Sequence, residues 1–105
     1  MLKRVEKIVM ITERIICSRI IEYLEVLGVE AYTIYKDVSG QGDRDIRSIS
    51  GGLSNFGENI RIEIIIADEE EAIHITEKLY DKYLNSKYAG IIYLEDVRIV
   101  DGELK

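Results

Sequence analysis

The residues best suited to bind a ligand lie in the first half of the chain, directly after a predicted strand. Gly40 and Gly42, on either side of Gln41, permit backbone conformations that other residues avoid, and they leave backbone N–H groups open to an anion. Arg44 and Arg47 follow at once, and their guanidinium groups are fork-shaped, permanently charged donors that match phosphate oxygens. The spacing predicts a cradle for a phosphorylated ligand.

The same segment has an interpretation that needs no ligand. Asp43 and Asp45 flank Arg44, so the arginines could instead pair with these carboxylates in a solvated, glycine-rich loop. From these residues alone, both interpretations stay open.

The composition limits the kind of partner. The chain has 105 residues, a size typical of one domain, and its 14 Lys and Arg against 20 Asp and Glu give a net charge of −6. This balance argues against a nucleic-acid-binding protein that works through a general basic field, so any positive site must be local. The single cysteine, Cys17, excludes an internal disulfide, and no cysteine and histidine residues have the spacing of zinc ligands.

The sequence shows no sign of secretion or of a membrane span. Residues 1–7 are charged and include no long apolar run or small-residue cleavage site. No stretch approaches the ~18 uninterrupted apolar residues that a transmembrane helix needs. We therefore expect a soluble, cytoplasmic protein that meets a membrane only through a partner, at the inner face of that membrane.

The elements that must position the candidate site alternate along the chain. Short runs rich in β-branched residues predict strands, and apolar residues at helical spacing predict helices. We expect Thr12 to cap the first helix and Gly28 to end it in a left-handed turn. Asp68, with Glu71 three residues later, predicts a capped start for the second helix. The predicted strands are 5–12, 30–38, 60–66 and 91–100, and the predicted helices are 13–27 and 68–83.

The order β-α-β-β-α-β predicts a single domain, 1–105, with a ferredoxin-like α+β fold: a four-stranded antiparallel sheet with two helices on one face. Residues 39–58 have no period and are expected to form a long loop, which in a compact domain is usually functional or mobile. Apolar residues fall on both faces of the predicted strands, as Ile64 and Ile65 do. A bare face of this kind is rarely tolerated in a soluble monomer, so we expect it to be buried against other copies of the chain.

Four stretches of the sequence resemble the PII-like signalling proteins, and specifically the small branch typified by SbtB, the regulator partnered with sodium-dependent bicarbonate transporters. The resemblance covers nearly the whole chain. The stretches are IVMITE at 8–13, GVEAYT at 28–33, GQGDRDIRS at 40–48 and YAGIIY at 88–93.

The resemblance implies a compact homotrimer with the three sheets facing inward and adenine nucleotides bound in the clefts between subunits. It also implies that residues 39–58 are a T-loop, whose shape reports the bound ligand to a membrane transporter. The phosphate contacts of the family correspond here to Arg44 and Arg47 with the backbone of Gly40, Gln41 and Gly42. The opposite wall of the cleft corresponds to Tyr88, Ala89 and Gly90.

The chain also departs from its better-known relatives. Members of the SbtB branch carry a C-terminal extension with a cysteine pair, linked to slow nucleotide hydrolysis, whereas this chain ends at Lys105 and has only Cys17. We therefore expect no redox switch. The longer T-loop with a modifiable tyrosine and the second phosphate-gripping loop of nitrogen-sensing PII proteins are not seen, which argues against 2-oxoglutarate sensing and uridylylation. Asp43 and Asp45 would repel a polyphosphate, which favours AMP, cyclic AMP or ADP over Mg-ATP.

Two other functions stay open at this stage. A nucleotide phosphohydrolase would use the same cleft, with Asp43 or Asp45 as its acidic group. A divalent-cation-binding trimer of the CutA kind shares the fold but gives no account of the paired arginines.

Phe56, alone in a polar loop, is the expected anchor for a protein partner, unless the loop folds back and buries it. His74 is expected on the surface of the second helix, and we expect no metal site and no catalytic residue.

Overall fold

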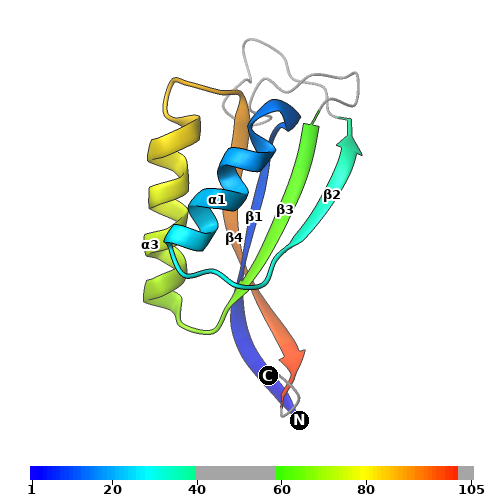
Figure 1. The fold of residues 1–105 in the computed structure, drawn as a ribbon. Coiled ribbons are helices and arrows are strands. Elements are labelled where there is room, and N and C mark those ends of the chain that lie inside the picture. Colours follow the sequence, from blue (N-terminus) through cyan, green and yellow to red (C-terminus); the bar gives the residue numbers. More distant parts are fainter. Residues whose placement is uncertain (40–58, 102–105) are drawn as a thin grey trace.

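The computed structural model describes residues 1–39 and 59–101, and it confirms the predicted α+β order (Figure 1). The chain ends of the described part lie together at one end of the molecule, where β1 begins and β4 ends. Within the described residues, no helix is long and apolar enough to cross a bilayer. The elements are β1 (Leu2–Glu13), η1 (Arg14–Ile16), α1 (Cys17–Val26), β2 (Thr33–Val38), β3 (Asn59–Ile66), α3 (Glu69–Leu79), η3 (Tyr80–Leu84) and β4 (Gly90–Val100).

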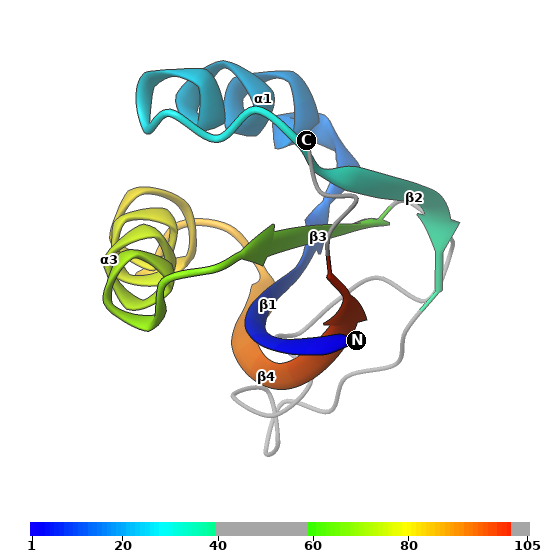
Figure 2. The ribbon, with the colours of Figure 1, turned by 90° about the horizontal axis from the view of Figure 1, so that it is seen from below.

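The four strands form one antiparallel sheet in the order β2-β3-β1-β4. Figure 2 shows α1 and α3 on the same side of this sheet, as the sequence predicted. The core lies between them, because alternate residues of β1 and β3 face the helices and are fully buried, Ile8 and Ile62 among them. The burial of these β-branched side chains is the main favourable term that holds the layers together.

Two of the three predicted helix boundary signals are confirmed, at Gly28 and at Asp68. Gly28 has a φ of +83°, and the N–H groups of Gly28 and Val29 donate to the carbonyls of Glu25 and Leu24 in the pattern of a Schellman motif that ends α1. At the start of α3, the side chain of Asp68 accepts a hydrogen bond of 2.8 Å from a backbone N–H of the first turn.

The predicted role of Thr12 as a helix cap is wrong. Thr12 is a fully buried residue of β1, and the chain turns into the helix one residue later, at Glu13, whose side chain makes no cap hydrogen bond. A turn of 3-10 helix, η1, then precedes α1. The hydroxyl of Thr12 instead donates a hydrogen bond to the backbone carbonyl of Ala89.

Two strand limits differ from prediction by more than one residue, for reasons of pairing. β1 begins at Leu2 rather than Val5, because residues 2–5 pair with the end of β4 beyond the rest of the sheet. β2 begins at Thr33 rather than Glu30, because Thr33 is the first residue that pairs with β3.

The sheet face away from the helices carries charges among its apolar residues. Lys7 Nζ lies 3.3 Å from Glu95 and 3.9 Å from Glu63, and Arg61 Nε donates to Glu63 at 2.9 Å. We call these four residues the ionic strip. Ile65, on the same face, is 42% exposed. The sequence predicted an apolar face. In the structure, this face also carries the four charged residues of the ionic strip, with apolar residues around them.

Candidate functional site

The structure describes part of the predicted nucleotide site. Tyr88 and Ala89 lie in the connection from η3 to β4, and Gly90 is the first residue of β4. The other predicted residues lie outside the described residues: Gly40, Gln41, Gly42, Arg44 and Arg47, and the predicted partner anchor Phe56.

Ala89 is held in place by both of its backbone polar groups. Its N–H donates to Glu13 Oε2 at 2.8 Å, and its carbonyl accepts a hydrogen bond of 2.6 Å from Thr12 Oγ1. We call these two hydrogen bonds the Ala89 clamp. Because its N–H is engaged, Ala89 has no backbone donor left for a ligand, and it can offer its methyl group and the second lone pair of its carbonyl oxygen.

Gly90 is required by packing. A Cβ atom at this position would lie 2.6 Å from the carbonyl oxygen of Ile11 and 2.8 Å from Leu84 Cδ2. The strand can therefore approach β1 this closely only if position 90 has no side chain. Together with the Ala89 clamp, this contact fixes where the connection from η3 enters the sheet.

The register brings this connection to the end of the sheet where residues 40–58 leave and return. Thr12 pairs with Gly90 on one side and with Ile60 on the other. Asn59, the next residue along, pairs with Val38 and its side-chain amide donates to the Val38 carbonyl at 3.1 Å. We call this edge the loop end of the sheet. At a strand spacing of ~4.8 Å, Ile60 and Gly90 are about 10 Å apart across β1.

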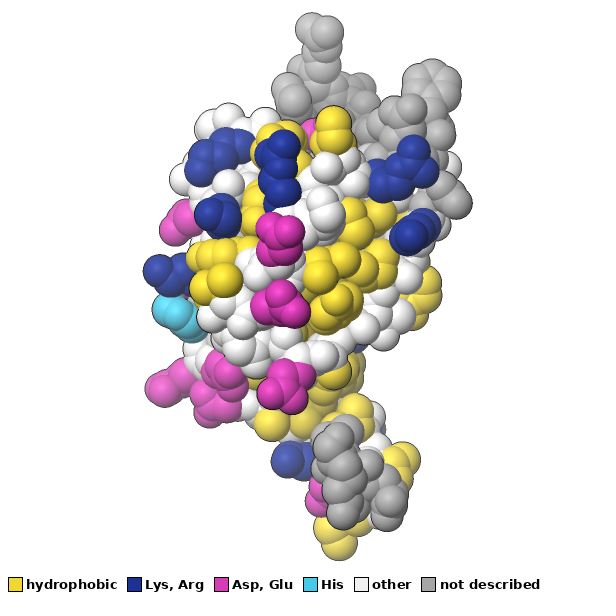
Figure 3. All heavy atoms as spheres, viewed as in Figure 1, with side chains coloured by type: hydrophobic (Ala, Val, Ile, Leu, Met, Phe, Trp, Pro, Cys, Tyr) yellow, Lys and Arg dark blue, Asp and Glu magenta, His cyan; other side chains and the backbone are white. Residues whose placement is uncertain are grey.

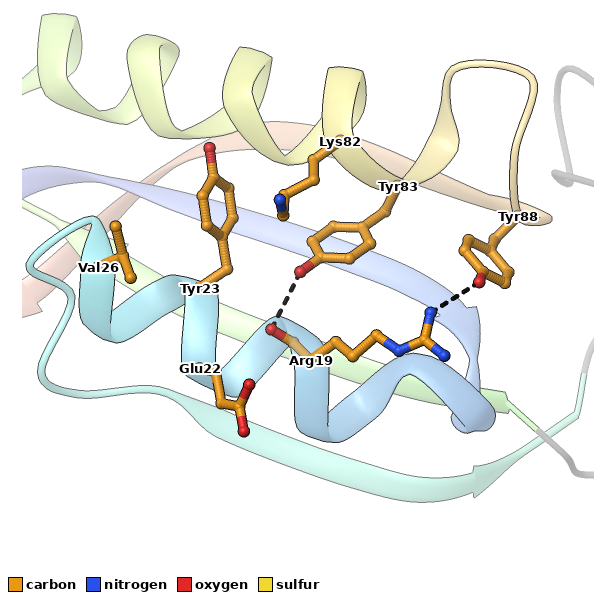
Figure 4. Close-up of a pocket in the computed structure, with 7 residues that line it drawn as sticks. All are labelled: Arg19, Glu22, Tyr23, Val26, Lys82, Tyr83 and Tyr88. Carbon is orange, nitrogen blue, oxygen red and sulfur yellow. Dashed lines mark hydrogen bonds between the residues drawn. The ribbon is translucent and has the colours of Figure 1, made fainter.

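The side chain of Tyr88 points to the helical face of the molecule (Figure 4). Its hydroxyl accepts a hydrogen bond of 2.9 Å from Arg19 Nη1, and its backbone N–H donates to the Tyr83 carbonyl at 2.9 Å. The predicted wall of the nucleotide cleft is therefore coupled to α1 and η3.

Tyr88 thereby lines a groove of about 450 Å³ between α1 and η3, which we call the interhelical groove. Tyr83 closes its floor: its hydroxyl donates to the Arg19 carbonyl at 3.0 Å, and burial raises the pKa of this hydroxyl. The groove is lined by Arg19, Glu22, Tyr23, Val26, Lys82, Tyr83 and Tyr88.

Sequence reasoning missed three residues of this region: Thr12, Glu13 and Arg19. Thr12 and Glu13 are two polar residues at the end of a buried strand, and this pattern indicates side chains that lie where the strands of a sheet end. Their partner, Ala89, lies 77 and 76 residues away in the sequence, so only the fold reveals the contact.

Two further residues whose side chains could do chemistry are a histidine and the single cysteine. His74 is exposed on α3, as expected, and Cys17 is a half-buried thiol that packs against the core. In residues 1–39 and 59–101, no three or more His, Cys, Asp or Glu side chains are grouped so that they could hold a metal ion.

Comparisons with known proteins agree on one family. The model of the nitrogen regulatory protein P-II family matches residues 5–103. A PII-like signaling protein from Thermus thermophilus is 35% identical, with 97% of this chain and 95% of that one covered and a TM-score of 0.71. CPII from Thiomonas intermedia, a nitrogen regulatory PII-like protein solved with ADP, AMP and bicarbonate, has the same fold at 20% identity, with a TM-score of 0.75 and with 95% of this chain and 99% of that one covered.

Proposed function

Since this chain belongs to the P-II family of nitrogen regulatory proteins, we propose that it is a non-catalytic sensor that binds an adenine nucleotide at the loop end of the sheet. The bound nucleotide, AMP, cyclic AMP, ADP or ATP, changes the shape of residues 39–58, which act as its T-loop. The change is read by a membrane transporter.

One observation carries the nucleotide part of the proposal. The register of the sheet puts the rigid connection at Tyr88–Gly90 beside the two points where residues 40–58 join the fold. The Gly40–Gly42 turn and both arginines belong to that segment, so the residues that bind the phosphate and the wall formed by Tyr88–Gly90 can meet at the loop end of the sheet. CPII, which has the same fold, was solved with ADP and AMP, and this supports the class of ligand.

We further propose a homotrimer in which the sheets face inward and each nucleotide lies between two subunits. The bare sheet face supports this arrangement, because it combines the exposed Ile65 with the ionic strip. Charges on an interface favour one register over others, and apolar contacts around them supply the association energy.

Signalling requires that the nucleotide bind one T-loop conformation more tightly than the other. Residues 39–58 would then present Phe56 to the partner in one nucleotide state and withdraw it in the other. By its resemblance to the SbtB-like branch, the partner is a transporter for bicarbonate or another small solute. This proposal puts the protein in the cytoplasm, recruited to the inner face of the membrane.

Calorimetry with AMP, cyclic AMP, ADP and ATP tests the site directly. Arg47→Ala and Arg44→Ala should each weaken binding about 10- to 100-fold, because a charge-assisted hydrogen bond is worth ~1.5–3 kcal/mol. Arg4→Ala is the matched control: it removes the same charge from an exposed residue at the opposite end of β1. Wild-type affinity for every nucleotide in both loop variants would remove the proposed site.

A further inference from the structure

The interhelical groove has the composition of a second ligand site, on the side of the molecule away from the ionic strip. Figure 4 shows the guanidinium of Arg19 and the ammonium of Lys82 reaching it from different elements, with tyrosine rings around them. Two of its lining residues are cations and one, Glu22, is an anion. A positive balance here stands out in a chain of net charge −6.

The ammonium group of Lys82 makes cation–π contacts with two tyrosine rings. Its Nζ lies 4.8 Å from the centroid of the Tyr23 ring and 6.0 Å from that of Tyr83, and these two rings pack edge to face. Among the described residues, neither Lys82 nor Arg19 forms an ion pair with a carboxylate. Both cations can therefore take an anionic ligand without first losing an internal ion pair.

The sign of the charge distinguishes between two classes of ligand. An external cation would have to displace Lys82 from the tyrosine faces and would meet Arg19 nearby. An anion meets two cations, one of which is a planar fork suited to a carboxylate or a phosphate. Tyrosine rings on the groove wall add stacking surface for a planar group.

The charges on the helical face and the size of the groove agree with an anionic ligand. On the helical face drawn in Figure 3, Lys and Arg side chains predominate in the upper half, nearest the loop end of the sheet, and Asp and Glu side chains predominate in the lower half. The groove volume of about 450 Å³ falls within the ~300–1,000 Å³ of ordinary small-molecule sites.

We propose that the interhelical groove binds a small planar organic anion, an aromatic ring that bears a carboxylate or a phosphate, between Arg19 and Lys82. The anion pairs with the two cations, and its ring packs against Tyr23 and Tyr88. This site is separate from the proposed nucleotide site, although Tyr88 belongs to the wall of both.

Ligand-observed NMR on the full chain tests the proposal with four probes: benzoate, phenyl phosphate, benzamide and acetate. Benzoate and phenyl phosphate should bind, whereas benzamide lacks the charge and acetate lacks the ring. Lys82→Gln and Arg19→Gln should each weaken benzoate binding about tenfold or more, because each removes one charge-assisted contact. Lys78→Gln removes an exposed lysine one helical turn earlier, outside the groove, and should bind benzoate as the wild type does.

Each result decides between the alternatives. Equal binding of benzoate and benzamide, or wild-type affinity in Lys82→Gln and Arg19→Gln, would overturn the assignment, as would a wild type that binds neither anion. Circular dichroism confirms that the exposed substitutions leave the fold intact. Since none of the four probes is a nucleotide, failure of the groove leaves the nucleotide titrations unaffected, and the reverse also holds.

Discussion

The Ala89 clamp offers the sharpest single perturbation of the proposed nucleotide site. Thr12→Val keeps the shape of a fully buried side chain but removes the hydroxyl that donates to the Ala89 carbonyl at 2.6 Å. A hydrogen bond contributes about 0.5–1.5 kcal/mol net, and a buried carbonyl left unsatisfied costs about 1–3 kcal/mol. Ala89 is only half-buried, so water can reach it in part, and we expect a loss of about 1–2 kcal/mol.

Thr12→Ser is the matched control. It keeps the hydroxyl but loses one buried methyl group, at a cost of about 1 kcal/mol. The two variants should therefore have similar free energies of unfolding and differ in the position of the Ala89 backbone. Urea unfolding at a fixed protein concentration measures the first quantity, and the fixed concentration matters because an oligomer is stabilised by mass action.

The nucleotide affinities should separate the two variants. If Tyr88–Gly90 forms a wall of the cleft, Thr12→Val should weaken ADP binding several-fold, and Thr12→Ser should bind ADP as the wild type does. Calorimetry with ADP gives both values. Equal ADP affinity in the two variants, at similar loss of stability, would refute the role given to the clamp.

Two further predictions concern assembly and pH. Ile65→Lys puts a charge on the bare sheet face and should reduce the mass in sedimentation equilibrium to that of a monomer. The control, Ile73→Lys, changes a similarly exposed isoleucine (40%) on α3 and should stay trimeric. A trimeric Ile65→Lys would place the interface elsewhere. The hydrogen bond with Asp96, together with burial, raises the pKa of Glu6 from 4.5 to about 6, so the folded state binds this proton more tightly than the unfolded state does. Stability from this pair is present below pH ~4.5 and is lost as the pH rises through about 6. Glu6→Gln should show a smaller fall in the urea midpoint between pH 4.5 and pH 7 than the wild type, and an equal fall would contradict the assignment.

The fold was predictable from local patterns because each signal acts within a few residues. Alternating β-branched runs indicated the strands, and helical spacing indicated the helices. The left-handed turn at Gly28 and the cap at Asp68 act within one helical turn, and both were found where expected. These signals need no knowledge of the rest of the chain.

The site was less predictable because its contacts join distant parts of the sequence. Thr12 has the residue type and position of a helix cap, but a partner 77 residues away takes its hydroxyl. The interhelical groove depends in the same way on how α1 packs against η3, and Arg19 looks like an ordinary solvated residue until that packing is known. In the ionic strip, Lys7 of β1 likewise reaches Glu63 of β3 and Glu95 of β4, and only the register reveals these cross-strand contacts.

The most direct test of the proposed function is an amide NMR titration of the isotopically labelled protein with ADP. We expect the amide signals of Tyr88, Ala89 and Gly90 to shift in a saturable way, with the signals of Leu2–Val5 at the opposite end of β1 unchanged. Saturable binding that leaves all three amides unmoved, or no binding of any adenine nucleotide, would contradict the claim that the loop end of this sheet is a nucleotide sensor.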